Sequence, residues 1–224
     1  MIGLAFFHTV ALVVAALVPI INPIGGAPIF LSMTQEFPEQ TLPGLARRIA
    51  MNVFVLLVAA TFIGTYVLEF FGLSLPAVQI GGGLLVASNG WKLLRGEEND
   101  EKKSTMLSNA TAEARIRMRA FYPLTFPLTA GPGTISVAIA LGASLPAQGL
   151  PRLALLVAIL AGILLVTLSV YLSYRFANKL LRWLGATGTM VLLRFSAFIL
   201  ICVGVQILTN GLGKVVEVWI RQSR

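Results

Sequence analysis

The amino-acid sequence predicts an all-α membrane protein with six transmembrane helices. We expect two inverted repeats of three helices, with the first and fourth helices discontinuous. Three observations lead to this prediction. The 224 residues are 57% apolar and only 12% charged, whereas a soluble domain carries about 25% charged residues. Six apolar segments follow one another, several of them long enough to cross a hydrocarbon core of about 30 Å. The first and fourth segments share one pattern of helix-breaking residues.

The six segments define a single membrane domain over residues 1–224. Repeat 1 takes about residues 1–94, a charged linker about 95–118, repeat 2 about 119–213, and a tail 214–224. The first segment has no Lys or Arg before its apolar run and no clear cleavage site, so we expect a retained helix rather than a signal peptide. The tail is either a short interfacial helix anchored by Trp219 or a frayed end. The approximate bounds of the segments are 3–33, 46–71, 75–94, 119–142, 153–175 and 188–210.

The distribution of Lys and Arg predicts the orientation. With six spans, the side that holds both termini carries four basic residues, and the opposite side carries twelve. The positive-inside rule therefore places the central linker in the cytoplasm and both termini outside it, for a multi-pass protein of the inner (plasma) membrane. Because this asymmetry accounts for the net charge of +8, we expect no nucleic-acid partner.

Two stretches rich in proline and glycine interrupt the first and fourth segments. NPIGGAP contains Pro23 and Pro28, and FPLTAGP contains Pro127 and Pro132, with the same spacing at an offset near 104 residues. Proline and glycine both disfavour a helix interior. Because three spans are an odd number, a second three-span unit enters the membrane from the opposite side and is inverted. Paired interrupted segments then mark a binding site near the midplane, unless they are kinks that only adjust packing.

The breaks predict the chemistry of a ligand. Half-helices that begin after Pro28 and after Pro132 have free N–H groups and a partial positive charge, which suit a carboxylate. Nearby carbonyls and hydroxyls suit an ammonium, and the glycines let a small ligand approach the backbone. A small zwitterionic amino acid has both groups. The expected substrate-binding residues are Asn22, Pro23, Gly25, Gly26, Pro28, Thr129, Gly131, Pro132, Gly133, Thr134 and Arg194.

Arg194 is the one charge well inside an apolar segment. Charges within a membrane are costly and often functional. Three roles stay open for Arg194: contact with a substrate carboxylate, capping of carbonyls freed by the breaks, or extension of its side chain to the cytoplasmic surface.

Enzyme motifs are missing from the sequence. It contains no HExxH, no GxSxG and a single histidine, His8, so we expect no enzymatic activity, no cofactor and no metal site. The single cysteine, Cys202, excludes a disulfide within the chain.

The motifs NPIGGAPIF and PLTAGPGTIS resemble those of the MarC family of bacterial and archaeal inner-membrane proteins, and the resemblance covers essentially the whole chain. It implies a relationship to SnatA-type transporters of small neutral amino acids, and two inverted three-helix repeats with discontinuous first and fourth helices. The chain departs from the family pattern at Gln79, where arginine is expected, and at Ala197, where glycine is expected. The family motifs fall on Asn22, Pro23, Gly25, Pro28, Gly131, Pro132, Gly133 and Thr134, and Arg194 matches a common arginine of the last helix.

The function that these observations favour is secondary transport of small neutral amino acids such as glycine or alanine, with export the favoured direction. The two repeats would rock around a midplane site. A channel or passive facilitator for small solutes, and a membrane scaffold without transport, remain as alternatives. The expected partners are the zwitterionic substrate and the lipid bilayer, and a homo-oligomer is left open.

Overall fold

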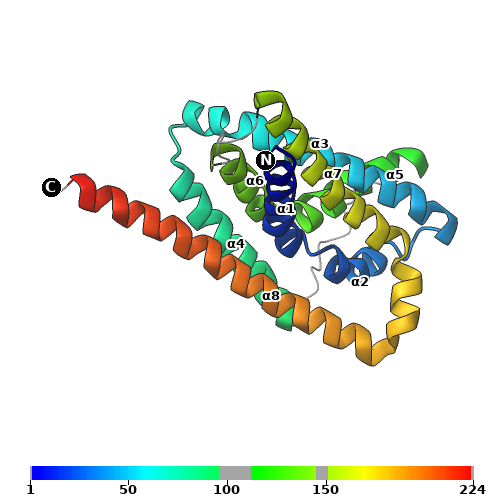
Figure 1. Cartoon of the computed structure of the whole chain (residues 1–224). Helices are drawn as coiled ribbons and strands as arrows, with labels where there is room; N and C mark the ends of the chain where they lie inside the picture. The colour runs from blue at the N-terminus through cyan, green and yellow to red at the C-terminus, as the bar shows by residue number, and fades with distance from the viewer. Residues whose placement is uncertain (1, 96–111, 145–150, 223–224) are drawn as a thin grey trace.

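The computed structural model describes residues 2–95, 112–144 and 151–222, and within these ranges the chain is helical and has no strands (Figure 1). Most of the expected linker and the last two residues of the tail lie outside the described residues. The elements in chain order are α1 (Ile2–Ile21), α2 (Pro23–Met33), a 3₁₀ turn η1 (Glu39–Thr41), α3 (Leu42–Phe70), α4 (Leu75–Arg95), α5 (Ala112–Arg119), a π-helical segment η3 (Ala120–Thr129), α6 (Pro132–Ser144), α7 (Arg152–Arg175) and α8 (Ala177–Gln222).

Proline and glycine set several of these boundaries. Pro23 and Pro132 occupy the first positions of α2 and α6, where the missing N–H costs nothing and the fixed φ suits a helix. Helix α3 ends before Gly72, whose φ of 65° turns the chain and whose N–H donates to the Glu69 carbonyl at 3.0 Å. The sequence therefore determines these helix ends locally.

Four segments are long and apolar enough to cross a membrane within the described ranges: Gly3–Met33, Glu39–Phe70, Arg152–Arg175 and Ala177–Glu217. The pair Ile116–Thr129 and Pro132–Ala143, bent by 69°, is a fifth if it crosses as one span. Helix α4 lies where the third span was expected, but its polar residues Gln79, Asn89 and Lys92 make it less apolar. The chain is thus an all-helical membrane protein with four to five candidate spans, and six spans stay a prediction.

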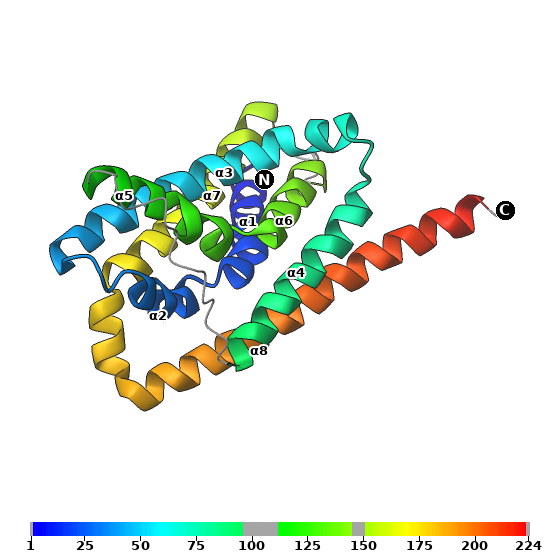
Figure 2. The same cartoon turned by 180° about the vertical axis from the view of Figure 1, so that it is seen from behind.

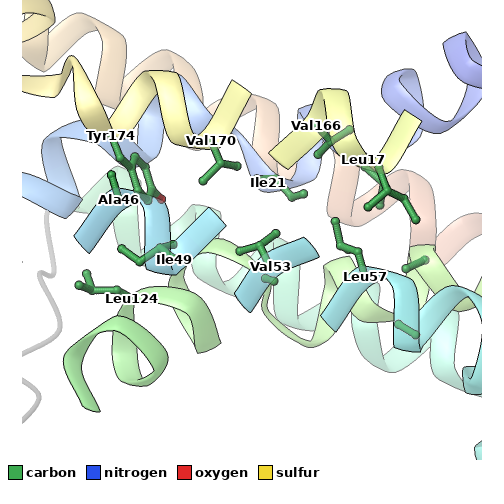
Figure 3. Close-up of a cluster of buried hydrophobic side chains, with 14 of the residues drawn as sticks. Leu17, Ile21, Ala46, Ile49, Val53, Leu57, Leu124, Val166, Val170 and Tyr174 are labelled. Atoms are coloured by element: carbon green, nitrogen blue, oxygen red, sulfur yellow. The ribbon is translucent and has the colours of Figure 1, made fainter. Parts of the chain in front are cut away.

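The core lies between α1, α3, α7 and η3 (Figure 3). Its fully buried side chains include Leu17 of α1, Ile49 and Leu57 of α3, and Val166 and Val170 of α7. Large apolar side chains also cover the outside of the molecule, as expected where lipid rather than water surrounds a protein. Because lipid is as apolar as these side chains, close packing rather than hydrophobic burial holds such helices together.

Helices α4 and α8 run antiparallel in close contact, and their small residues make this contact possible (Figure 2). A Cβ added at Gly83 would lie 2.6 Å from the Gly204 carbonyl oxygen, and one added at Gly204 would lie 2.4 Å from the Ala87 nitrogen. Two helical turns further along α4, a Cβ at Gly90 would lie 2.9 Å from the Ala197 carbonyl oxygen. The two backbones therefore touch along a seam of small residues spaced seven apart, which is typical of helix pairs in membranes. We call this contact the α4–α8 seam.

Helix α8 is longer than the expected sixth span. It starts at Ala177, before the expected 188, and continues through the tail to Gln222, so that its end projects beyond the other helices (Figures 1 and 2). The exception to helical geometry is Gly185, with φ 64° and ψ −176°. This residue bends α8 into a short first arm (177–184) and a long second arm.

The two halves of the chain meet in matching pairs. Helix α3 packs on α7 and α4 packs on α8. Helix α2 lies on α8, while α6, its counterpart in the second half, lies on α4. In the same way α1 lies on α7 and η3 lies on α3. Each broken helix thus contacts the third helix of the other half.

Candidate functional site

The first break is a single left-handed residue, Asn22, with φ 47° and ψ 62°. Its side-chain Oδ1 accepts a hydrogen bond from the Gly25 N–H at 3.2 Å, and its carbonyl accepts one from the Gly26 N–H at 2.9 Å. Asparagine tolerates this conformation and caps a helix well. The expectation that the half-helix begins after Pro28 is wrong: α2 begins at Pro23, directly after this cap, and Pro28 lies inside it.

The second break is longer. Tyr122 and Phe126 have extended backbones, with φ/ψ of −120°/126° and −123°/125°. Each precedes a proline, which disfavours helical geometry at the residue before it. Helix α6 begins at Pro132 as expected, and the Ile135 N–H bonds the Gly131 carbonyl at 3.1 Å. The first-turn N–H groups of α6, at 133 and 134, have no acceptor within the helix.

Tyr174, near the end of α7, joins the two breaks. Its hydroxyl lies 2.9 Å from the Thr129 hydroxyl of the second break. A Cβ added at Gly26, in the first turn of α2 just after the first break, would lie 2.8 Å from the same Tyr174 oxygen. The Tyr174 ring stacks on Phe30 of α2 with a centroid distance of 4.7 Å, and the side chain is buried in the core shown in Figure 3. One hydroxyl therefore lies between both interrupted motifs.

The sequence did not single out Tyr174. A tyrosine in the last turn of a transmembrane helix is usually assigned to the aromatic belt at the membrane surface. Its contacts to Gly26 and Thr129 link residues far apart in the chain, and no spacing in the sequence signals them. Ser196 of α8 was missed for the same reason.

The glycines of the breaks bring the two motifs against α8 and α4. A Cβ added at Gly25 would lie 2.4 Å from the Ser196 hydroxyl oxygen of α8. A Cβ added at Gly133 would lie 1.9 Å from a methyl carbon of Val86 in α4. The Ser136 hydroxyl, one turn along α6, lies 3.1 Å from the Val78 carbonyl of α4. Neither glycine has room for a side chain.

The expected site residues separate into two groups. Those of the two motifs lie around the breaks and are buried or half-buried. Arg194 is exposed, and it lies two positions before the buried Ser196, about 200° around the helix. A role for Arg194 in binding stays a prediction. The first group is Asn22, Pro23, Gly25, Gly26, Pro28, Thr129, Gly131, Pro132, Gly133 and Thr134.

The two departures from the family pattern lie against the α4–α8 seam. Gln79 is buried, and its Oε1 has no hydrogen-bond partner among the described residues. A Cβ added at Gly211 of α8 would lie 3.1 Å from the Gln79 Cβ. Ala197 is fully buried where it faces Gly90. Among the described residues, no three His, Cys, Asp or Glu side chains gather where a metal could bind.

Comparison with known proteins identifies the family. The model of the MarC family of integral membrane proteins matches residues 7–216. The inner membrane protein MarC of Citrobacter koseri is 30% identical over 219 residues, covering 95% of this chain and 98% of that protein. The MarC proteins of Salmonella typhimurium and Escherichia coli are 29% and 27% identical, over 95% and 96% of the chain and 98% and 99% of those proteins. No solved structure matches the chain significantly. The chain is therefore a multi-pass protein of the inner membrane and belongs to the MarC family of integral membrane proteins.

Proposed function

We propose that the protein is a secondary transporter that exports small neutral amino acids such as glycine or alanine by alternating access. The observation that carries this proposal is the convergence of both broken motifs on Tyr174. Its hydroxyl lies 2.9 Å from the Thr129 hydroxyl and in contact range of Gly26. Interrupted membrane helices that meet inside the protein are where transporters bind their substrates.

The pairing of helices supports an inverted repeat. Helices α1 to α4 correspond to the α5–η3–α6 unit, α7 and α8, and contacts in one half have counterparts in the other. In this proposal α4 is the third of six spans, because its 21 residues are enough to cross the hydrocarbon core. The linker is cytoplasmic and both termini lie outside the cytoplasm, as the distribution of basic residues predicts.

The chemistry of the breaks suits a zwitterion. The first-turn N–H groups of Gly133 and Thr134 are donors for a carboxylate at the positive end of α6. The hydroxyl oxygens of Thr129 and Tyr174 are acceptors for an ammonium group. Gly25 packs against Ser196 and Gly133 against Val86 without room even for a Cβ, so the breaks are closely packed and a small amino acid is the zwitterion we propose.

A transporter of this kind moves its substrate without changing it chemically, so in this proposal the protein is not an enzyme and uses no cofactor. Its partners are the amino acid and the lipid bilayer, and nucleic acid is not among them. The proposal is independent of oligomeric state, and a homo-oligomer is compatible with it.

Counterflow in proteoliposomes tests the proposal. Vesicles preloaded with unlabelled glycine should accumulate labelled glycine faster than empty vesicles, and the rate should saturate. A channel would pass labelled glycine at the same rate whether or not unlabelled glycine is present inside the vesicles, and a scaffold would give no flux. Either result, repeated with alanine, would overturn the proposal.

A further inference from the structure

The bend of α8 at Gly185 is a backbone feature that only glycine adopts readily. Its φ of 64° with ψ near 180° lies in a region that side chains exclude. No atom lies within 4 Å of a Cβ added there, so the space around Gly185 is open. Figure 1 shows α8 changing direction between its two arms, and the second arm packs on α2 where Ser196 lies against Gly25.

An open cleft of about 540 Å³ occupies this elbow. Its walls come from both arms of α8, from the end of α2 and from η1. The lining residues that matter here are Leu31, Glu39, Asn178, Arg182 and Thr189.

Opposite charges lie on the two sides of this cleft. The Asn178 side-chain N–H₂ donates to Glu39 Oε1 at 3.4 Å, and Arg182 Nε donates to the Asn178 carbonyl at 3.2 Å. A carboxylate and a guanidinium are therefore held on either side of one residue. Both keep hydrogen-bonding capacity, because these bonds use only one of the five guanidinium N–H donors and one carboxylate oxygen. The charges of this pair are complementary in sign to the ammonium and the carboxylate of a zwitterion.

The cleft lies beside the contact that covers the first break. Leu31 follows Phe30, which stacks on Tyr174. On the other wall, Thr189 lies two helical turns, about 10 Å, before Ser196. Ser196 is the α8 residue against which Gly25 packs. A molecule in the cleft is therefore next to the α2–α8 contact, on the far side of which lie Tyr174 and the breaks.

We propose that this cleft is the entrance through which a free amino acid reaches the breaks, with Glu39 binding its ammonium and Arg182 its carboxylate. The inference rests on the proposed transport function and adds a second, peripheral binding site to it. With the predicted topology, this entrance faces the cytoplasm. It serves one face of the membrane only.

Sided transport assays test the entrance. Glu39→Gln and Arg182→Gln should each raise the KM for glycine about threefold to tenfold in uptake by inside-out vesicles, because each removes one charge-assisted contact at an exposed site. The KM in right-side-out vesicles should be unchanged. Lys179→Gln is the matched control, since Lys179 lies on the same arm but packs on Phe176 outside the cleft, and it should alter neither KM.

A phosphatidylethanolamine headgroup carries the same pair of charges, so lipid composition separates the two sources. The KM change should persist in vesicles of phosphatidylcholine and phosphatidylglycerol alone. A change that requires phosphatidylethanolamine, an equal change from both faces, or no change would overturn the entrance while leaving wild-type transport intact. A wild-type protein without saturable flux would instead overturn the proposed function, and the entrance with it.

Discussion

The Thr129 and Tyr174 hydroxyls lie 2.9 Å apart although their residues are 45 positions apart in the chain. Thr129 also hydrogen-bonds the Leu124 carbonyl at 2.6 Å, so its own hydrogen serves that bond and Tyr174 is the donor to Thr129. The Tyr174 hydroxyl consequently has its oxygen lone pairs left for another donor. An ammonium group arriving between the breaks would find these lone pairs in place.

Tyr174→Phe should therefore weaken transport more than folding. The ring and its stacking on Phe30 remain, and loss of one buried hydrogen bond costs about 1 kcal/mol of stability. We expect the KM for glycine in counterflow to rise about tenfold, since a hydrogen bond to a charged group is worth about 1.5–3 kcal/mol. Tyr171→Phe, which removes a hydroxyl bonded to the exposed Arg175, is the control. An unchanged KM in Tyr174→Phe would exclude contact between this hydroxyl and the substrate.

Gly133→Ala should disturb the second break by overpacking. The new Cβ would overlap a Val86 methyl carbon, which lies 1.9 Å from its position, and such overpacking costs about 1–3 kcal/mol. We expect reduced glycine flux and a lower midpoint of thermal unfolding in detergent.

The double variant Gly133→Ala with Val86→Ala checks this cause. Removing the Val86 methyl groups makes room for the new Cβ, so the double variant should recover flux and stability relative to Gly133→Ala alone. Gly81→Ala, where nothing lies within 4 Å, should behave as wild type. Strictly additive effects of the two substitutions would show that the residues do not interact.

Asn22 should tolerate glycine better than alanine. Asn22→Ala loses the hydrogen bond from the Gly25 N–H to the side chain. It also places alanine, whose side chain cannot form a compensating hydrogen bond, at a φ of 47°. The cap and the conformation are each worth about 1 kcal/mol or slightly more. Asn22→Gly keeps the conformation and should cost only a few tenths. Thermal unfolding in detergent measures the difference, and equal losses in both variants would argue against the left-handed conformation.

Gly204→Val should be the most damaging of these changes. A Cβ at Gly204 would lie 2.4 Å from the backbone nitrogen of Ala87, and backbone cannot rotate away as a side chain can. We expect α4 to separate from α8, with poor expression and early thermal unfolding. Gly213→Val, on the same helix where nothing lies within 4 Å, should be tolerated. Similar stability of the two variants would contradict the seam.

The sequence predicted helices well where local chemistry sets them. The expected third span, 75–94, differs from α4 by one residue, because the turn at Gly72 precedes it and a charged stretch follows it. The start of α6 at Pro132 was predicted from the proline itself, which interrupts a preceding helix and is favoured at the first position of the next. The start of α2 was not, since Pro28 is accommodated inside the helix while the left-handed Asn22 makes the break. A positive φ leaves no mark on apolar periodicity, and Gly185 was missed for this reason too.

The site was predicted in part. Proline and glycine spacing placed the two breaks in the chain but did not identify what lies between them. Tyr174 reaches both motifs only because α7 packs against α1, α2 and α3, and such long-range contacts depend on the complete fold. Arg194 was singled out for its charge alone, and the charge does not determine which face of α8 carries it.

The α4–α8 seam determines which parts of this protein can move as bodies. It joins one helix from each half of the chain through backbone contact, so the halves cannot part without opening it. The joined pair touches both breaks, through Ser196 of α8 on Gly25 and through Val86 of α4 on Gly133. In the proposed transporter, access would then alternate between the two membrane faces by a tilt of the joined helices α4 and α8 against the bundle of the remaining helices. We therefore expect this helix pair of the proposed transporter, rather than each repeat as a whole, to move as one body.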